Sequence, residues 1–168
     1  MALSTADDVR PGDSMSEHQW PDLAGRIVDD EHGRRHVLPV RVYFEDTDFS
    51  GLVYHASYVR WCERGRSDFL RLLGNDHRAL IDGESGREPA AFVVRRMTLE
   101  YLKPARIDEV LQVETHLKEL GAASLTLSQV ITRDGAMLFE AEVMVVLVSV
   151  SGKPLRISQA VRAAFGSI

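Results

Sequence analysis

The 168-residue sequence is poor in cysteine and has no long hydrophobic run. Cys62 is the only cysteine, so no disulfide can form within the chain, as is usual in a reducing compartment. No apolar run reaches the roughly 20 residues that cross a bilayer, and the first residues lack a basic region followed by an apolar core. We therefore expect a cytoplasmic protein with no transmembrane segment and no signal peptide.

An excess of positive charge is also missing. The chain has 20 Lys and Arg residues against 25 Asp and Glu residues, giving a formal net charge of -5. Nucleic acids and anionic membranes are bound through basic surfaces, so we expect neither as a partner. The 45% hydrophobic and 27% charged content is that of an ordinary globular protein, although a locally basic cleft for an anionic cofactor is compatible with it.

The first part of the chain differs from the rest. Residues 1–35 contain few periodic apolar positions and several acidic residues. Such a composition does not offset the conformational entropy lost on ordering. We predict a flexible N-terminal arm over residues 1–35, with a short helical turn near residues 23–28, followed by one folded domain over residues 36–168.

One strand and one long helix are predicted in the first half of this domain. Residues 37–45 are rich in valine and aromatic residues, which favours a strand with Pro39 at its start or edge. Apolar residues then recur every three or four positions over residues 57–73, which predicts a helix roughly 25 Å long. Gly74 suits its end, and residues 76–89 form a polar connection that we expect to be mobile. The predicted apolar face of the helix consists of Tyr58, Cys62, Gly65, Phe69 and Leu72 or Leu73.

The second half of the domain alternates with a period of two, as strands do. We predict strands over residues 91–101, 110–119, 124–132 and 137–150, with a hairpin turn at Asp134-Gly135. Residues 155–168 are short and mixed. Because strands and helices do not alternate, a doubly wound parallel sheet is excluded. The predicted class is α+β, with a twisted antiparallel sheet of about five strands wrapped around the single long helix.

The loop between the first strand and the helix carries residues suited to catalysis. Asp46, Thr47 and Asp48 are followed seven positions later by His55. Unpaired N–H groups at the start of a helix can stabilise an oxyanion, and Asp48 would be placed to attack a carbonyl carbon or to activate water. The residue types alone favour a turn and helix-capping role for the acidic cluster, and a structural role for His55. A Mg²⁺ site is a weaker alternative, because no further acidic motif or phosphate-binding glycine loop follows.

The longer pattern around this loop resembles the signature of the 4-hydroxybenzoyl-CoA thioesterase family, and is most similar to its Tol–Pal-associated acyl-CoA thioesterase subfamily. The resemblance covers about residues 38–160. Its three stretches are Arg41-Val42-Tyr43-Phe44-Glu45-Asp46-Thr47-Asp48 with Gly51, Val53-Tyr54-His55-Ala56-Ser57-Tyr58, Glu63-Arg64 and Arg66; Ala91 to Tyr101 with Pro104-Ala105-Arg106; and Glu140-Ala141-Glu142-Val143.

The resemblance implies a hotdog fold and hydrolysis of acyl-CoA thioesters to free acid and CoA, with no metal and no cofactor. It places the catalytic carboxylate at Asp48, and it assigns to His55 a backbone N–H that polarises the thioester carbonyl and a side chain that assists. Acyl carrier protein is an alternative carrier of the substrate, and a homodimer or homotetramer is implied. The substrate contacts that it implies are Tyr43, Gly51, Val53, Tyr54, Arg95 and Arg96.

Two positions call for separate treatment. The subfamily often has a second tyrosine where this chain has Phe44, so a hydroxyl that could contact the site is missing. Some hotdog thioesterases instead carry their catalytic carboxylate on the central helix, where this chain has Glu63. We interpret Glu63 as an ion-pair partner of Arg66 or Arg60, because residues three apart on a helix are neighbours.

Two other functions compete with hydrolysis. A non-catalytic acyl-CoA or acyl-carrier-protein binding module, or scaffold, of an envelope-associated complex would bind without turnover. The acidic residue at position 48 argues against it and Phe44 mildly favours it. A hotdog dehydratase ranks last, because its Asp/His arrangement is not present in the sequence.

Overall fold

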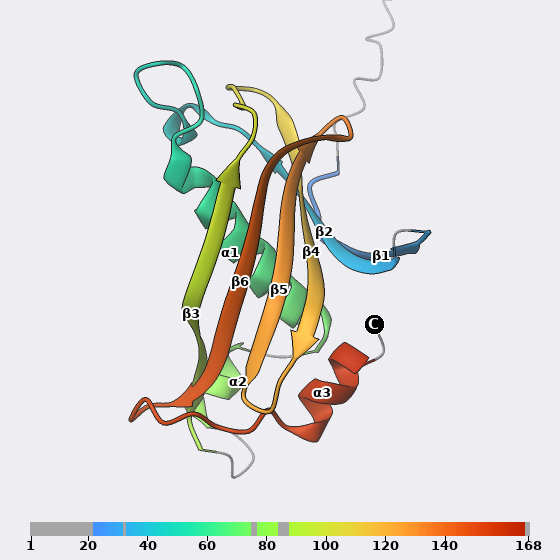
Figure 1. The fold of residues 1–168 in the computed structure, drawn as a ribbon, viewed down its shortest axis with the longest axis vertical. Helices are drawn as coiled ribbons and strands as arrows, with labels where there is room; N and C mark the ends of the chain where they lie inside the picture. The colour runs from blue at the N-terminus through green and yellow to red at the C-terminus, as the bar shows by residue number, and fades with distance from the viewer. Residues whose placement is uncertain (1–21, 32, 75–76, 84–87, 167–168) are drawn as a thin grey trace, which may run out of the picture.

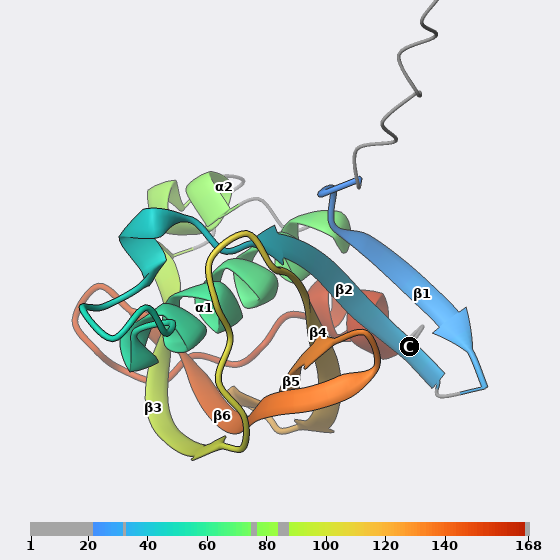
Figure 2. The same ribbon diagram turned by 90° about the horizontal axis from the view of Figure 1, so that it is seen from above.

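The computed structural model describes residues 22–31, 33–74, 77–83 and 88–166. In this part of the chain one long helix, α1 (His55–Leu72), lies against a curved sheet of six strands (Figure 1). Seen from above, the sheet bends around α1 (Figure 2). The predicted α+β architecture, an antiparallel sheet around one long helix, is confirmed. The strands are β1 (Arg26–Asp30), β2 (Gly33–Arg41), β3 (Ala90–Tyr101), β4 (Val110–Leu120), β5 (Ser124–Arg133) and β6 (Ala136–Ser149).

The strand order across the sheet is β1-β2-β4-β5-β6-β3, and every neighbouring pair is antiparallel. The predicted hairpin between β5 and β6 is present. Asp134 and Gly135 have φ angles of 50° and 78°, the positive values that a two-residue hairpin turn requires. β3 ends the sheet on one side and has β6 as its only strand partner in the described chain. It is therefore an open edge strand.

The prediction of a flexible arm up to residue 35 is wrong for residues 26–31 and 33–35. β1 pairs with β2 from Arg26 opposite Val37 to Asp30 opposite Gly33, and no helical turn forms near residues 23–28. Gly25 also packs against the domain, since a Cβ there would lie 1.8 Å from Asp68 Oδ2. Backbone pairing with β2 orders a polar segment whose composition alone predicts disorder, and it adds the sixth strand. Residues 1–21 lie outside the described part.

The first predicted strand begins and ends earlier than its composition suggests. β2 stops at Arg41, and Phe44–Asp46 form a short 3₁₀ helix instead. The carboxylate of Asp46 accepts a hydrogen bond from the Tyr43 N–H at 2.9 Å, which satisfies that donor within a turn rather than in a ladder. Pro39 lies beyond the last β1 pair, where β2 bonds only to β4 and a missing N–H is tolerated.

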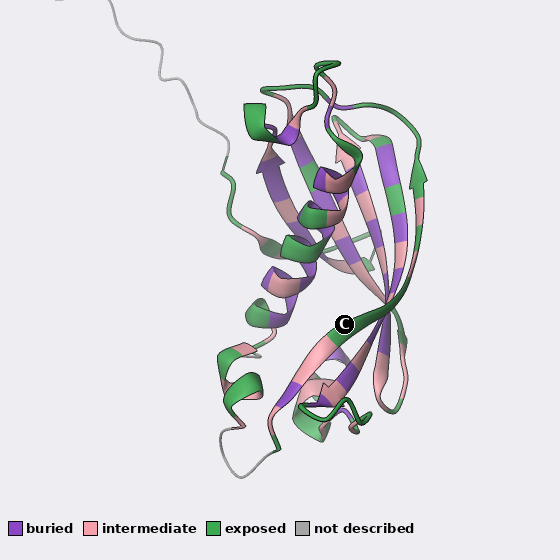
Figure 3. Ribbon diagram, turned by 90° about the vertical axis from the view of Figure 1, so that its left-hand side faces the viewer, coloured by how far each residue is buried: buried purple, intermediate pink, exposed green. Residues whose placement is uncertain are grey.

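Helix α1 buries one face against the sheet, as its spacing predicts, and exposes the other (Figure 3). Tyr58, Cys62 and Phe69 are almost fully buried, and burial raises the pKa of the Cys62 thiol to about 12. Of the expected Leu72 or Leu73, Leu73 packs against the core, while Leu72 is exposed on the last turn. Asp68 lies outside the predicted apolar face of the helix, yet it is buried.

Asp68 is buried because it meets a histidine from β2. His36 is fully buried, and its Nε2 lies 2.8 Å from Asp68 Oδ2, while Arg71 bonds the other carboxylate oxygen. Burial lowers the pKa of His36, opposed by the hydrogen bond and the charge of Asp68. The folded protein thus favours a neutral imidazole that donates to Asp68 and ties the start of the sheet to the end of α1.

An aromatic cluster fills the space between the other end of α1 and the sheet. The Phe139 ring, fully buried, stacks on Tyr58 with 5.4 Å between centroids and meets Tyr101 edge-on at 5.0 Å. The Tyr58 hydroxyl oxygen also accepts a hydrogen bond from the Ala105 N–H at 2.9 Å. This cluster fixes the first turns of α1 relative to β3 and β6.

Two short helices close the opposite end of the sheet (Figure 1). They are α2 (His77–Asp82) and α3 (Gln159–Gly166). α2 lies within residues 76–89, which we predicted as a polar connection, and it packs along β3. α3 lies within the mixed segment at the end of the chain, and its Phe165 contacts Phe69 of α1 edge-on at 5.7 Å. None of the described helices is long and apolar enough to cross a membrane.

Candidate active site

The loop before α1 is held in a tight, hydrogen-bonded turn. The Asp48 N–H donates to Leu52 O at 2.9 Å, and the Gly51 N–H returns to Asp48 O at 3.0 Å. Gly51 has a φ of +76°, a conformation that favours glycine. The Val53 N–H then donates to Ala105 O at 2.9 Å, which anchors the loop to the segment after β3. Asp48 therefore occupies a defined position on the surface.

The Asp48 carboxylate is bonded on one side and open on the other. Its Oδ1 accepts the Ser50 N–H at 2.8 Å and the Ser50 Oγ–H at 2.5 Å. These bonds, the hydroxyl first, lower the pKa of Asp48, and the charge of a nearby His55 adds to the shift. Its Oδ2 accepts no hydrogen bond from the described residues. At neutral pH the site thus presents an ionised carboxylate with one free oxygen.

The start of α1 leaves two donors available beside this carboxylate. Tyr54 occupies the N-cap position but makes no side-chain capping bond. Within the described chain, no acceptor takes the N–H groups of His55 and Ala56, whereas the Ser57 N–H bonds Tyr54 O at 2.8 Å. Free N–H groups at a helix start, together with the helix dipole, attract an anion or a developing oxyanion.

Aromatic side chains fix the His55 ring. The Tyr54 ring lies 4.3 Å from it between centroids, and the Tyr101 ring meets it edge-on at 6.5 Å. The Tyr101 hydroxyl also donates to His55 O at 3.0 Å, so the end of β3 is joined to the first residue of α1. The structure thus brings Asp48, the start of α1 and the end of β3 together.

The alternatives for the acidic cluster can now be compared with the geometry. Asp46 and Asp48 both bond backbone amides of their own loop, as the turn interpretation predicts. Asp46 also belongs to a capping box at the start of the short 3₁₀ helix, as the capping interpretation predicts, whereas neither aspartate caps α1. In the described residues, no group of three or more His, Cys, Asp or Glu side chains lies close enough to hold a metal ion.

The residues implied as substrate contacts divide into two sets. Tyr43 and Tyr54 are exposed next to the loop, while Val53 is buried beneath it. Arg95 and Arg96 are exposed on the open edge strand β3, where Arg95 forms a bulge. Arg96 is five residues from Tyr101, or roughly 16 Å along the strand. Within one chain, therefore, the two arginines do not lie at Asp48.

Sequence reasoning missed Ser50 and Tyr101. The signal for Ser50 was local, since a serine two positions after an aspartate commonly bonds its carboxylate or backbone in a turn. Tyr101 had no such signal, because its contact with His55 joins segments 46 residues apart. The expected ion pair of Glu63 is wrong: Glu63 accepts the Ser67 Oγ–H at 2.7 Å, Arg60 bonds Ser57, and Arg66 bonds Gln129.

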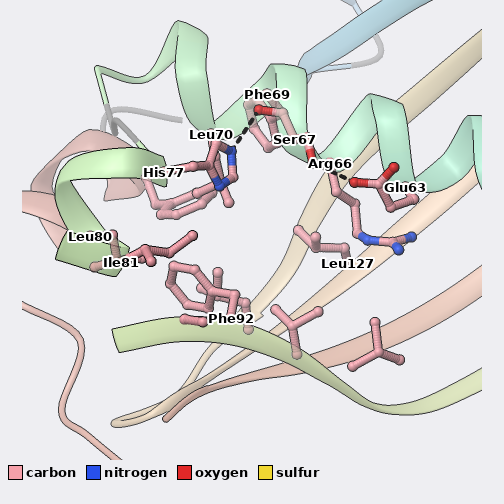
Figure 4. Close-up of a pocket in the computed structure, with 15 residues that line it drawn as sticks. Glu63, Arg66, Ser67, Phe69, Leu70, His77, Leu80, Ile81, Phe92 and Leu127 are labelled. Carbon is pink, nitrogen blue, oxygen red and sulfur yellow. Dashed lines mark hydrogen bonds between the residues drawn. The ribbon is translucent and has the colours of Figure 1, made fainter. Parts of the chain in front are cut away.

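A separate cavity of about 250 Å³ lies between the second half of α1 and β3, under α2 (Figure 4). Most of its lining is apolar, with polar groups contributed by α1 and α2. Its first lining residue on α1, Glu63, is eight positions after His55, which corresponds to roughly 12 Å along the helix axis. Within one chain, the cavity thus lies beside the second half of α1, while the Asp48 loop lies at the start of this helix.

Comparison with known proteins shows which family this fold and this loop belong to. Residues 42–165 match the family described as the thioesterase-like superfamily. The chain belongs to this superfamily. It is 43% identical over 129 residues to the acyl-CoA thioester hydrolase YbgC of Escherichia coli O6:H1, an alignment that covers 76% of this chain and 92% of the relative. The acyl-CoA thioesterase YbgC of Haemophilus influenzae is 38% identical over the same shares.

A solved structure agrees with these relatives. A probable thioesterase from Bartonella henselae superposes with a TM-score of 0.71 at 42% identity, covering 74% of this chain and 99% of that one. The predicted membership of a hotdog thioesterase family is therefore confirmed. In this chain, the region that matches the superfamily, residues 42–165, contains the Asp48 loop, α1 and all of the sheet except β1 and β2.

Proposed function

We propose that this protein hydrolyses acyl-CoA thioesters to a free acid and CoA, with Asp48 as the catalytic carboxylate and without a metal ion. The observation that carries the proposal is the ionised, half-open carboxylate of Asp48 beside the free N–H groups that begin α1. The names of the relatives support the same substrate class. The thioester carbonyl oxygen would lie at the N–H groups of His55 and Ala56.

Two routes are compatible with one free carboxylate oxygen. In the first, Asp48 Oδ2 attacks the carbonyl carbon, the C–S bond breaks, and water then hydrolyses the mixed anhydride to restore the carboxylate. In the second, Asp48 takes a proton from water as the water oxygen attacks. In both, the thiolate of CoA leaves and is protonated. The helix-start N–H groups stabilise the oxyanion, each typically contributing about 3 kcal/mol.

The remaining substrate contacts follow from charge and position. We assign the acyl chain to a pocket between helix and sheet near a subunit interface, because within one chain the aromatic cluster fills the space beside the start of α1. The CoA phosphates are anionic and need basic partners at the surface. The exposed candidates on and after β3 are Arg95, Arg96, Lys103 and Arg106.

Steady-state hydrolysis of an acyl-CoA panel tests the proposed activity. We expect turnover of several acyl-CoAs of graded chain length, and measurement with the matching acyl carrier proteins identifies the preferred carrier. A protein that binds acyl-CoA tightly without releasing CoA would instead be the non-catalytic binding module.

The hydrogen bonds from Ser50 give a specific pH dependence. They lower the pKa of Asp48, so Asp48 stays ionised to a lower pH than an ordinary carboxylate. Wild-type kcat/KM should therefore stay constant until the pH falls below the usual carboxylate range. In Ser50→Ala the pKa of Asp48 rises towards its ordinary value, and the acid limb of the profile should move to higher pH. The measurement is kcat/KM against pH for both proteins.

Thr47→Val is the matched control for that experiment. Thr47 lies in the same loop, but its hydroxyl donates to Phe44 O at 2.9 Å rather than to Asp48. The acid limb of the Thr47→Val pH profile should therefore coincide with that of the wild type. An unchanged limb in Ser50→Ala would show that Asp48 does not set the pH dependence of the reaction.

We also propose that the protein forms a homodimer through β3. Twelve residues of this strand lack a second strand partner in the described chain, and Val93 is 42% exposed on it. A long, apolar, open edge strand is a surface for pairing with another strand. Such pairing would also bring Arg95 and Arg96 of one chain towards a second copy.

Light scattering after size exclusion measures the assembly. The wild type should have at least twice the 18.8 kDa mass of one chain. Val93→Lys should lower this mass to that of a monomer by placing a charge in the pairing surface. Val150→Lys changes an equally apolar and even more exposed residue outside β3 and should leave the mass unchanged. A monomeric wild type rules out the dimer.

A further inference from the structure

The cavity under α2 carries a buried positive charge at one end. Arg66 is only 8% exposed and lines the cavity from α1. In Figure 4 its side chain runs from the helix towards the sheet beside Leu127, whereas His77, Leu80 and Ile81 lie at the opposite end. No carboxylate of the described residues lies within 4.0 Å of its guanidinium group, since none of the ion pairs there includes Arg66.

The partner that holds Arg66 is neutral. Gln129 Nε2 donates to Cys62 O and to Thr115 Oγ1, both at 2.9 Å, which turns Oε1 towards Arg66 Nη1 at 2.7 Å. A guanidinium group has five N–H donors in a planar fork, and only this one bond to the described protein is made. Burial lowers the pKa of Arg66, opposed by the nearby Cys62 and Glu63. The fork is therefore fixed in place with donors to spare.

Glu63 does not neutralise this fork by contact. It lies one turn earlier on α1 and is exposed, and its Oε1 is bonded by Ser67 Oγ at 2.7 Å. A buried cation without a contacting anion is costly to the folded protein, and an anionic ligand relieves that cost. Carboxylates, like phosphates, match an arginine fork with two parallel hydrogen bonds, and a carboxylate is the smaller of the two groups.

The other end of the cavity is mostly apolar and lies beside α2. Phe69, Leu80, Phe92 and Phe165 come from four different elements and form its walls. His77 Nε2 lies 3.1 Å from Ser67 O; because a carbonyl only accepts, this nitrogen donates, and the bond holds α2 over the cavity. A ligand that fits must combine an anionic head with a hydrocarbon tail.

We propose that this cavity binds an unbranched carboxylic acid of about six to eight carbons, with its carboxylate on Arg66 and its chain directed towards Leu80 and Phe165. The length follows from the volume of about 250 Å³. A methylene group is similar in size to a water molecule, whose share of the liquid is about 30 Å³, so the cavity holds roughly eight such groups. The binding site stands independently of hydrolysis; only the origin of the acid as the enzyme's own product rests on the proposed function.

Isothermal titration calorimetry with sodium octanoate and 1-octanol tests the head group. Wild-type protein should bind octanoate at least tenfold more tightly than octanol, because only the acid pairs with Arg66. Arg66→Met keeps an apolar side chain of similar length and should weaken octanoate by roughly 10- to 100-fold while leaving octanol unchanged. Arg64→Met, an exposed arginine on the same helix, should bind octanoate like the wild type. Equal affinity for acid and alcohol in the wild type would overturn the proposal.

The apolar end gives a second test that does not alter Arg66. Leu80→Trp should fill the cavity and abolish binding of octanoate, with folding checked by circular dichroism. In the wild type, affinity should rise from butanoate to octanoate and then stop rising. Unchanged binding to Leu80→Trp, or a steady rise through dodecanoate, would place the acid elsewhere.

Hydrolysis kinetics identify where the acid comes from. If octanoate inhibits octanoyl-CoA hydrolysis competitively, with an inhibition constant equal to its calorimetric Kd, the acid is the retained product. If it binds without inhibiting, the acid is supplied from elsewhere. Calorimetry with Asp48→Asn keeps the two proposals apart, because octanoate should bind this variant with wild-type affinity whether or not the wild type shows turnover.

Discussion

Asp48→Asn should reduce kcat/KM for acyl-CoA hydrolysis by roughly 10²- to 10⁴-fold, the usual contribution of a positioned general base or nucleophile. An amide neither attacks a thioester effectively nor takes a proton from water, yet it has the same shape and still accepts the bonds from Ser50. The loop should therefore keep its structure. The measurement is steady-state hydrolysis of the best acyl-CoA of the panel, with binding of the same substrate followed separately.

Two variants make this result specific. Glu45→Gln removes an exposed carboxylate three positions earlier and should leave kcat/KM within a factor of about two, because a single surface charge has a small effect in salt. His55→Ala removes the ring but keeps the backbone N–H, so it should lose less activity than Asp48→Asn. Equal rates for Asp48→Asn and wild type would remove Asp48 from the mechanism, and complete loss in His55→Ala would make the imidazole central.

Phe139→Ala should lower the free energy of unfolding by about 3–5 kcal/mol, the range observed when a buried aromatic ring is replaced by a methyl group. Phe139 is fully buried and its ring contacts Tyr58 and Tyr101, so the deletion leaves a cavity where two rings lose a packing partner. Tyr101 in turn holds the first residue of α1. The loss of stability should thus be accompanied by weaker hydrolysis.

Phe49→Ala is the matched control, because Phe49 is the same residue type with a fully exposed ring. Its unfolding free energy should stay within about 0.5 kcal/mol of the wild type. Urea denaturation at one fixed protein concentration measures both, since stability depends on concentration if the protein is a dimer. A loss below about 1 kcal/mol in Phe139→Ala would mean that the aromatic cluster repacks around the deletion.

Most elements of the fold are predictable from local patterns. The period-two stretches give β3 to β6 to within a residue or two, and Asp134-Gly135 gives the hairpin because few other pairs adopt two positive φ angles. Apolar spacing gives α1 and most of its buried face. These elements can be predicted from the sequence because each pattern involves residues only a few positions apart.

β1 and the burial of Asp68 are not predictable in the same way. β1 is short and mostly polar, and it is ordered by backbone bonds to β2 together with the packing of Ile27 against the core. Asp68 reads as a surface residue of a helix until His36 of β2 is packed against it. In both cases the stabilising partner comes from another element, so no local pattern contains it.

For the site, the sequence by itself determined the loop of Asp48 and the turn at Gly51, while only the family resemblance placed His55 at the helix start, two residues before the start predicted from apolar spacing. These features lie within eight consecutive residues, and their geometry is set by local hydrogen bonds. Tertiary structure alone decided that Tyr101 fixes His55 and that Arg66 is buried on Gln129 rather than paired with Glu63. Charge in a sequence does not specify its surroundings; the packing of α1 on the sheet decides which charges face solvent and which face a cavity.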